Sequence, residues 1–232
     1  MLEVKQYTSN ILHELSFVLP KEENLIILGQ NGAGKSTLAK VLSQLIPNES
    51  VYLDSKRVDE LSSLQRALKI NYIPPKLSIF DDYMTLQEFL ELSFIDEVNP
   101  AKIEKVIELL KLQKLQHRCC KEFSSGEKQL TLLASALIHN AQITIFDELT
   151  ANLDISRLKE VFDIFNSEWL AQKVIITHNL DLAYALKYRV MFIKEGKIAF
   201  FGEHEEFFNN ENLKRFYNDT IIKLQSHLVV NL

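Results

Sequence analysis

The sequence has few of the features that mark disulfide-rich, zinc-binding or membrane-spanning proteins. Its two cysteines, Cys119 and Cys120, are adjacent, which excludes a disulfide framework and a four-ligand zinc site. The apolar runs LIIL, ITIF, VIIT and VMFI are each about four residues long, whereas a helix needs about 18 apolar residues to cross a bilayer. The start, MLEVKQYTSN, lacks the basic and apolar regions of a secretory signal. We therefore expect a protein of a reducing compartment with no membrane span of its own.

Positive charge is also scarce, with 26 lysines and arginines against 31 aspartates and glutamates and a net charge of −5. The composition thus offers no broad polycationic surface, and we expect no nucleic-acid partner. A chain of 232 residues, 47% of them hydrophobic, can bury a sizeable core. No repeat, low-complexity tract or Gly/Ser linker interrupts it, so we predict a single domain over residues 1–232.

The four apolar runs are continuous rather than alternating, which is typical of strands buried on both faces of a parallel sheet. Strand character in LEVKQY and SVYLD predicts a smaller antiparallel part. Amphipathic spacing predicts helices at residues 35–46, 85–94 and 100–115. We therefore predict an α/β fold: a mostly parallel core from residues 1–75 and 142–232, with residues 76–141 as an inserted α-helical subdomain.

The segment LIILGQNGAGKST combines a buried strand, a glycine-rich turn and a helix start, and it matches the phosphate-loop pattern G-x-x-x-x-G-K-[ST]. The glycines let successive backbone N–H groups point at phosphate oxygens, and the helix N-terminus adds partial positive charge. Lys35 would bridge the terminal phosphates, and the Ser36 hydroxyl would bind magnesium. The pattern predicts a P-loop NTPase whose nucleotide-binding residues are Gly29, Asn31, Gly32, Ala33, Gly34, Lys35, Ser36 and Thr37.

A second apolar strand, ITIFDE at residues 143–148, ends in two acids. In a nucleotide hydrolase this arrangement puts Asp147 at the magnesium ion and Glu148 beside the attacking water. Because the pair follows the phosphate loop in the correct order, it strengthens the prediction of a nucleotide hydrolase.

Three further segments complete a family pattern. FSSGE resembles the ATP-binding-cassette (ABC) signature LSGGQ, with Ser125 replacing the first glycine and Glu127 replacing the glutamine. LTANLD resembles the D-loop, with Asp154 at its acidic position, and His178, after the strand VIIT, stands at the switch histidine. The chain therefore resembles the ATP-binding subunit of an ABC transporter over nearly its whole length. This resemblance implies a RecA-like core with an inserted helical subdomain.

The resemblance implies an active ATPase with ATP and Mg²⁺ as cofactors. Glu148 would polarise the attacking water, His178 would contact the γ-phosphate and link it to that water, and Lys35 completes the predicted catalytic set. Ser36 and Asp147 would hold the metal ion.

The resemblance also implies contacts beyond the phosphate loop. Tyr7 lies about where the family places an aromatic residue that stacks on adenine. The family forms head-to-tail dimers that enclose two ATP molecules, so one chain would carry half of each site. The contacts to the nucleotide of the other copy would come from Ser124, Ser125, Gly126, Glu127 and Asp154.

A stand-alone cassette of this length most resembles subunits that dock on separate membrane permeases, because repair-type and translation-type cassettes carry long insertions or a second cassette. The implied partners are a second copy of the chain, permease subunits and a substrate-binding protein, at the cytoplasmic face of the cell membrane. Residues 53–74 resemble a segment of iron–siderophore, haem and cobalamin importers. Two alternatives stay open: a cassette of an exporter or of another substrate class, and a degenerate cassette that binds ATP as a structural or regulatory partner.

Two segments raise separate questions. In the family the strand corresponding to INYIP is followed by a glutamine that reaches magnesium, but here the position is Pro75, which has neither an amide side chain nor a backbone N–H. Either water fills the vacant place, or a polar side chain from residues 76–82 takes it. The apolar spacing of residues 220–232 predicts a terminal helix docked on the domain, with a membrane or partner helix as the alternative.

Overall fold

The computed structural model describes residues 1–232 except 80, 152, 219, 225–226 and 231–232. Its central sheet consists of β3 (Leu25–Gly29), β6 (Ile70–Ile73), β7 (Ile143–Asp147), β8 (Gln172–Ile176), β9 (Arg189–Lys194) and β10 (Lys197–Gly202). The strand order is β10-β9-β3-β8-β7-β6. β9, β3, β8, β7 and β6 pair in parallel, and β10 pairs antiparallel with β9. The prediction that the four apolar runs are strands of a mostly parallel sheet is confirmed.

Both faces of this sheet are buried. Along β3, Leu25 and Ile27 enter one hydrophobic cluster, whereas Ile26 and Leu28 enter another. All four side chains are at most 1% exposed. Successive side chains of a strand point to opposite faces, so a continuous apolar run is what a strand covered on both sides requires.

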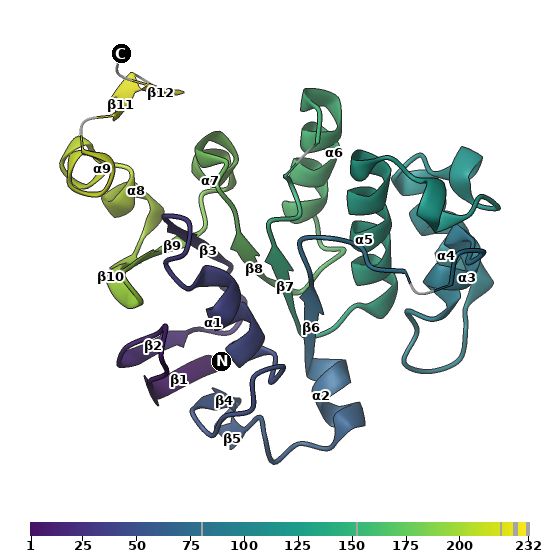
Figure 1. Cartoon of the computed structure of the whole chain (residues 1–232), viewed down its shortest axis with the longest axis horizontal. Helices are drawn as coiled ribbons and strands as arrows, with labels where there is room; N and C mark the ends of the chain where they lie inside the picture. Colours follow the sequence, from purple (N-terminus) through teal and green to yellow (C-terminus); the bar gives the residue numbers. More distant parts are fainter. Residues whose placement is uncertain (80, 152, 219, 225–226, 231–232) are drawn as a thin grey trace.

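A small antiparallel sheet and one helix cover the first face. The sheet has the order β2-β1-β4-β5 and contains β1 (Leu2–Tyr7), β2 (Leu15–Leu19), β4 (Val51–Leu53) and β5 (Lys56–Arg57). Helix α1 (Lys35–Leu42) packs with it in the same hydrophobic cluster, and both lie at the lower left of the molecule in Figure 1. The predicted antiparallel part is therefore present. Helix α2 (Ser63–Lys69) leads from it into β6.

A group of helices lies beside the outer strand β6, at the right of Figure 1. It contains α3 (Leu86–Glu91), α4 (Pro100–Leu109), the short 3-10 helices η1 (Gln113–Leu115) and η2 (Cys120–Glu122), and α5 (Ser125–His139). Capping residues set the helix starts: Thr85 and Ser124 each form a capping box with a glutamate three residues on, and Asn99 caps α4 ahead of Pro100. These helices fall within the predicted insertion, whose boundaries at 76 and 141 stay a prediction.

The second half of the chain adds helices to the other face of the sheet and ends differently from the prediction. The helices are α6 (Ile155–Phe165), α7 (Leu180–Leu186), α8 (His204–Phe207) and α9 (Asn210–Tyr217). The predicted terminal helix is wrong: β11 (Ile221–Leu224) and β12 (His227–Val230) pair as an antiparallel hairpin. Asn218, with a left-handed φ of 51°, ends α9, and the β-branched residues that follow favour strands. Residues 225–226 and 231–232 of that run lie outside the described residues.

Within the described residues, every helix is too short or too polar to cross a membrane.

A pair of leucine substitutions tests the packing of α5. Leu133→Ala should lower the free energy of unfolding by about 2–5 kcal/mol, because Leu133 is fully buried in the cluster that joins α5 to the sheet. Leu45→Ala, the matched change at a side chain that is 60% exposed, should cost less than about 0.5 kcal/mol. Urea denaturation of both variants measures the difference. Equal losses would contradict the packing described here.

Candidate functional site: a phosphate loop at the ends of parallel strands

The phosphate loop joins β3 to α1, and its glycines are required by backbone geometry. Gly29 has φ +148°, and a Cβ there would lie 2.3 Å from the Ile193 carbonyl oxygen of β9. Gly34 has φ +103° and is the N-cap of α1. A side chain at either place would meet both strain and a close neighbour. The loop can therefore turn its N–H groups toward a phosphate only because these positions are glycine.

Lys35 lies under this loop and holds it closed. Its ammonium Nζ donates hydrogen bonds to the carbonyl oxygens of Gly29 and Gln30, both at 2.9 Å. Burial lowers the pKa of Lys35 from its ordinary value, against the opposing effect of the Glu148 and Asp147 carboxylates. The positive charge is thus held at the centre of the loop, where the terminal phosphates of a nucleotide would lie.

A cavity of about 240 Å³ opens over the loop. Apart from phosphate-loop residues, it is lined by Glu148 and by Ile11, whose side chain is 48% exposed. The phosphate-loop residues that line it are Asn31, Gly32, Gly34, Lys35, Ser36 and Thr37. Ala33 is buried in the cluster around α1 rather than in this lining.

Asp147, at the end of β7, is fully buried beside the loop. Its Oδ1 accepts a hydrogen bond from the Ser36 hydroxyl at 3.0 Å. Its Oδ2 accepts one from the Tyr72 hydroxyl, also at 3.0 Å. Burial, and then the nearby Asp147 carboxylate, raise the pKa of Tyr72, so this hydroxyl stays a donor.

These oxygens fit a magnesium ion. Among the described residues, Asp147 forms no direct ion pair: its hydrogen bonds come from neutral hydroxyl groups, and the Lys35 ammonium acts on it from farther away. A carboxylate and a hydroxyl are hard oxygen ligands, and Mg²⁺ in nucleotide sites is typically bound through one or two such side chains plus phosphates. No group of three or more histidine, cysteine and acidic side chains suited to a metal occurs in the described part of the chain.

Glu148 and His178 form a pair at the edge of the cavity. The His178 Nε2 lies 2.6 Å from the Glu148 Oε1, and both side chains are partly exposed. Glu148 has a left-handed φ of 54°, which turns its side chain away from the line of β7. The loops after β7 and β8 are also joined by the hydroxyls of Thr150 and Thr177, 3.3 Å apart. The arrangement can hold one carboxylate oxygen while leaving the other free to accept a proton.

The segment after η2 forms the start of α5. Ser124 is its N-cap: the Ser124 Oγ accepts from the Glu127 N–H at 3.3 Å and donates to the Glu127 Oε2 at 2.8 Å. The backbone N–H of Ser124, and then its hydroxyl, hold the pKa of Glu127 below its ordinary value. Asp154 likewise caps α6 by accepting from the Arg157 N–H. None of the predicted cross-dimer residues lines the phosphate-loop cavity.

Comparison with known proteins decides the family. A family model described as ABC transporter matches residues 12–151, more than half of the 232 residues. The chain belongs to the ABC transporter family. It carries the ATP-hydrolysing cassette of that family.

Two curated relatives of this cassette agree. An uncharacterized ABC transporter ATP-binding protein of Methanocaldococcus jannaschii is 32% identical over 229 residues, which cover 93% of this chain and 89% of that protein. The molybdate/tungstate import ATP-binding protein WtpC of Pyrococcus abyssi is 30% identical over 223 residues. That alignment covers 91% of this chain but only 64% of WtpC.

Solved structures with low sequence identity share the fold. A bacterial Atm1-family ABC exporter with ATP bound has a TM-score of 0.79 at 20% identity, covering 92% of this chain and 40% of that one. CbiO1 of Clostridium perfringens has a TM-score of 0.76 at 21% identity, covering 94% of each chain. A dimeric ATP-binding cassette with ADP and Pi in a post-hydrolysis state has a TM-score of 0.74 at 22% identity, covering 88% and 99%. The fold is that of a P-loop NTPase of the ABC type.

Tyr7, which the sequence predicts to stack on adenine, lies in a hydrophobic core of the ABC cassette. Its side chain is only 7% exposed and packs in the hydrophobic cluster of the small antiparallel sheet. A ring buried in this way has little free face to stack on adenine. Ile11, four residues later in the chain, lines the cavity instead.

The loop at Pro75 also differs from the family pattern. The Pro75 carbonyl accepts a hydrogen bond from the Gln129 Nε2 of α5 at 2.8 Å, and the other amide atom of Gln129, Oε1, is buried without a partner. Lys76, Ser78 and Asp81 line a separate pocket between β6 and the helices. The alternative that a polar side chain from residues 76–82 reaches the metal stays a prediction.

Sequence reasoning missed Tyr72, Ile11 and Gln129. Tyr72 had a partial signal, since it is a polar-tipped residue in the predicted strand INYIP, but the sequence analysis did not place that strand beside the one that carries Asp147. Ile11 and Gln129 had no such signal, because the residues beside them in the structure are far away in the sequence. The D-loop residue 152 lies outside the described part of the chain.

A substitution at Tyr7 separates core packing from stacking. Tyr7→Leu should leave ATP affinity unchanged and lower the melting temperature, because the ring is buried in the core. A base that stacks on an aromatic ring gains about 1–3 kcal/mol, so loss of a true stacking residue would weaken ATP binding about 5- to 150-fold. Binding of a fluorescent ATP analogue distinguishes the two results, with Ile11→Ser as the matched change at the cavity wall.

Proposed function

We propose that this cassette is the ATP-hydrolysing subunit that powers an ABC transporter, working as a head-to-tail dimer docked on membrane permease subunits. The observation that carries the proposal is the Glu148–His178 pair at the mouth of the phosphate-loop cavity, next to Asp147 and Ser36. A binding module without turnover has no need for a positioned general base. The complete set of Lys35, Ser36, Asp147, Glu148 and His178 therefore favours an active ATPase over a degenerate cassette.

The residues of one chain have separable roles in this proposal. The loop N–H groups, the N-terminus of α1 and Lys35 bind the phosphates, while Ser36 and Asp147 hold Mg²⁺. The metal supplies charge neutralisation on the phosphate oxygens. The His178 Nε2 holds the Glu148 Oε1, which leaves the Oε2 to accept the proton of the attacking water.

The signature segment would complete the site of a second copy. It lies at the N-terminus of the 15-residue helix α5, where Ser124, Ser125 and Gly126 can present a hydroxyl, N–H groups and the helix dipole to a phosphate. Because no signature residue lines the phosphate-loop cavity of its own chain, a partner must bring it there. In this arrangement, ATP holds the dimer together, and hydrolysis removes the charge that does so.

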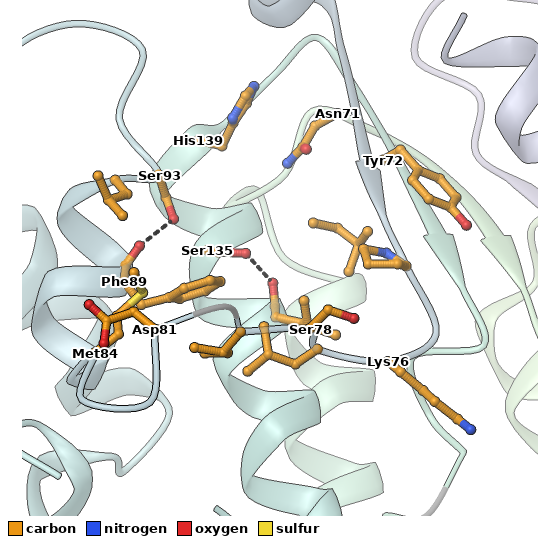
Figure 2. A pocket seen from close by; sticks show the side chains of 16 residues that line it. Asn71, Tyr72, Lys76, Ser78, Asp81, Met84, Phe89, Ser93, Ser135 and His139 are labelled. Carbon is orange, nitrogen blue, oxygen red and sulfur yellow. Dashed lines mark hydrogen bonds between the residues drawn. The ribbon is translucent and has the colours of Figure 1, made fainter. Parts of the chain in front are cut away.

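The pocket between β6 and the helices is the proposed permease site. It has a volume of about 530 Å³. Figure 2 shows Asn71 and Tyr72 on one side of it and Met84 and Phe89 on the other. Leu92 at its rim is 72% exposed. A pocket with such an apolar lining suits a short apolar helix of a partner, and its floor contains the Pro74–Lys76 loop that leads toward the nucleotide site.

The proposal extends to location and cargo. Attachment to permeases would hold the cassette at the cytoplasmic face of the cell membrane. We propose import, which the similarity to the molybdate/tungstate import protein supports, whereas the exporter shares only the fold. For the cargo, the resemblance of residues 53–74 favours an iron–siderophore, haem or related metal chelate delivered by a substrate-binding protein. The permease and binding protein encoded beside this gene, reconstituted with the cassette, would show whether a chelate or an oxyanion stimulates ATP hydrolysis.

Removal of the proposed general base tests the ATPase mechanism. Glu148→Gln should reduce phosphate release by about 100- to 1000-fold while ATP binding and ATP-dependent dimerisation persist, because the amide keeps the size but cannot accept the proton. Phosphate release and light scattering measure the two properties. Glu97→Gln, the same change at an exposed position, should behave as wild type. Near-normal turnover of Glu148→Gln would refute the assignment.

A charged residue at the pocket rim tests permease docking. Leu92→Asp should abolish copurification with the permease subunits, because it places a charge against an apolar partner, while ATP hydrolysis by the isolated cassette is unchanged. Leu64→Asp is the matched control, since Leu64 is also an exposed leucine, 57% exposed, but lies on α2 outside the pocket. Equal copurification of both variants with the permease would refute this docking site.

A further inference from the structure

The Asp147 carboxylate is held by two hydroxyl groups that come from opposite sides. The Ser36 hydroxyl, from the first turn of α1, donates to Oδ1, and the Tyr72 hydroxyl, from β6, donates to Oδ2, each at 3.0 Å. Among the described residues these are the hydrogen bonds that fix the two oxygens of a fully buried acid. The orientation of the carboxylate therefore depends on both donors.

The two hydroxyls are not equivalent. Ser36 is itself a proposed metal ligand, so its oxygen is shared between Asp147 and the ion. Among the described residues, the Tyr72 hydroxyl has Asp147 as its hydrogen-bond partner and is not a proposed metal ligand. When the nucleotide and metal are bound, the Tyr72 hydroxyl is the donor that can keep the carboxylate plane fixed.

Tyr72 is well placed for this task. It lies inside β6, with Asn71 and Ile73 paired to β7 on either side of it, and its ring packs on the cluster that contains α1. β6 is also the strand next to β7, which ends in Asp147. The phenol therefore reaches the acid from a strand that is fixed to it by the sheet.

The loop that follows β6 cannot give the same support. Pro75 has no side-chain donor and no N–H. Its carbonyl is already bound by Gln129, and the described side chains just after it line the pocket between β6 and the helices rather than the metal site. Within the described residues, the polar support that the structure shows for the metal ligand from this part of the chain comes from the strand.

We propose that Tyr72 is a positioning residue of the magnesium site, and that its hydroxyl does the work of the amide side chain that Pro75 cannot provide. The inference rests on the proposed function, because it requires Mg²⁺–ATP to bind at Asp147 and Ser36. One consequence is that the metal ligand is held by the rigid sheet. Tyr72 also lines the pocket between β6 and the helices, so a partner bound there would lie beside the residue that holds the metal ligand.

The test compares single hydroxyl deletions in the full chain. A fluorescent ATP analogue is titrated at a series of Mg²⁺ concentrations, and again in EDTA, with wild type, Tyr72→Phe and Tyr188→Phe. Tyr188 is the matched control, because its hydroxyl donates to a backbone carbonyl, that of Phe165, away from the site. We expect Tyr72→Phe to raise the Mg²⁺ concentration at half-maximal binding about 10-fold or more, as for loss of other groups that orient a metal ligand. Affinity in EDTA should not change, and Tyr188→Phe should shift neither value.

A second pair of variants tests whether a glutamine at position 75 can do the work of the Tyr72 hydroxyl. Pro75→Gln in the Tyr72→Phe background should bring the Mg²⁺ concentration at half-maximal binding much of the way back to the wild-type value. The same change in wild type should have a smaller effect. No restoration would refute the claim that the two groups do the same work.

Other results would overturn the positioning role or the proposed function. An unshifted Mg²⁺ midpoint in Tyr72→Phe, or an equal loss of affinity with and without Mg²⁺, would overturn the positioning role, since the second result reports only damaged packing. If wild type itself bound the analogue without any dependence on Mg²⁺, the proposed function would fail as well. A failure confined to the variants would leave that function intact.

Discussion

The buried carboxylate of Asp147 is the interaction on which the rest of the site depends. It ends β7, the strand next to the outer strand β6, and its two oxygens tie α1 to β6 through Ser36 and Tyr72. A buried charge is costly unless it is paired, well hydrogen-bonded or bound to a metal. Holding this carboxylate in place therefore also fixes the position of α1, the helix that follows the phosphate loop, relative to β6, the outer strand of the sheet.

The parallel sheet explains why the other functional groups gather around this acid. The carboxyl ends of β3, β7 and β8 meet at one edge, which brings the phosphate loop, Glu148 and His178 together. Open α/β sheets bind ligands at this edge because the loops there belong to adjacent strands. Position 29 must be glycine, because β9 passes too close to it to admit any side chain.

The loop after β6 is attached to the helical part through a hydrogen bond and an apolar pocket. Gln129, near the start of α5, holds the Pro75 carbonyl, and the pocket between β6 and the helices lies alongside. A partner in that pocket would act on the loop and on the helix that begins with the signature segment. Tyr72 lines the same pocket and donates to Asp147, so such an action would reach both the signature and the metal ligand.

The sequence by itself determined the elements whose cause is local. The apolar runs, the glycines of the phosphate loop and the capping boxes at Thr85 and Ser124 each depend on residues a few positions apart, and the structure contains all of them. Only the tertiary structure decided which distant side chains meet. Tyr72 and Asp147 lie 75 positions apart, and they meet because β6 and β7 pair in one register. The burial of Tyr7 and the exposure of Ile11 were decided in the same way, by the packing of the small sheet against α1, which no spacing along the chain encodes.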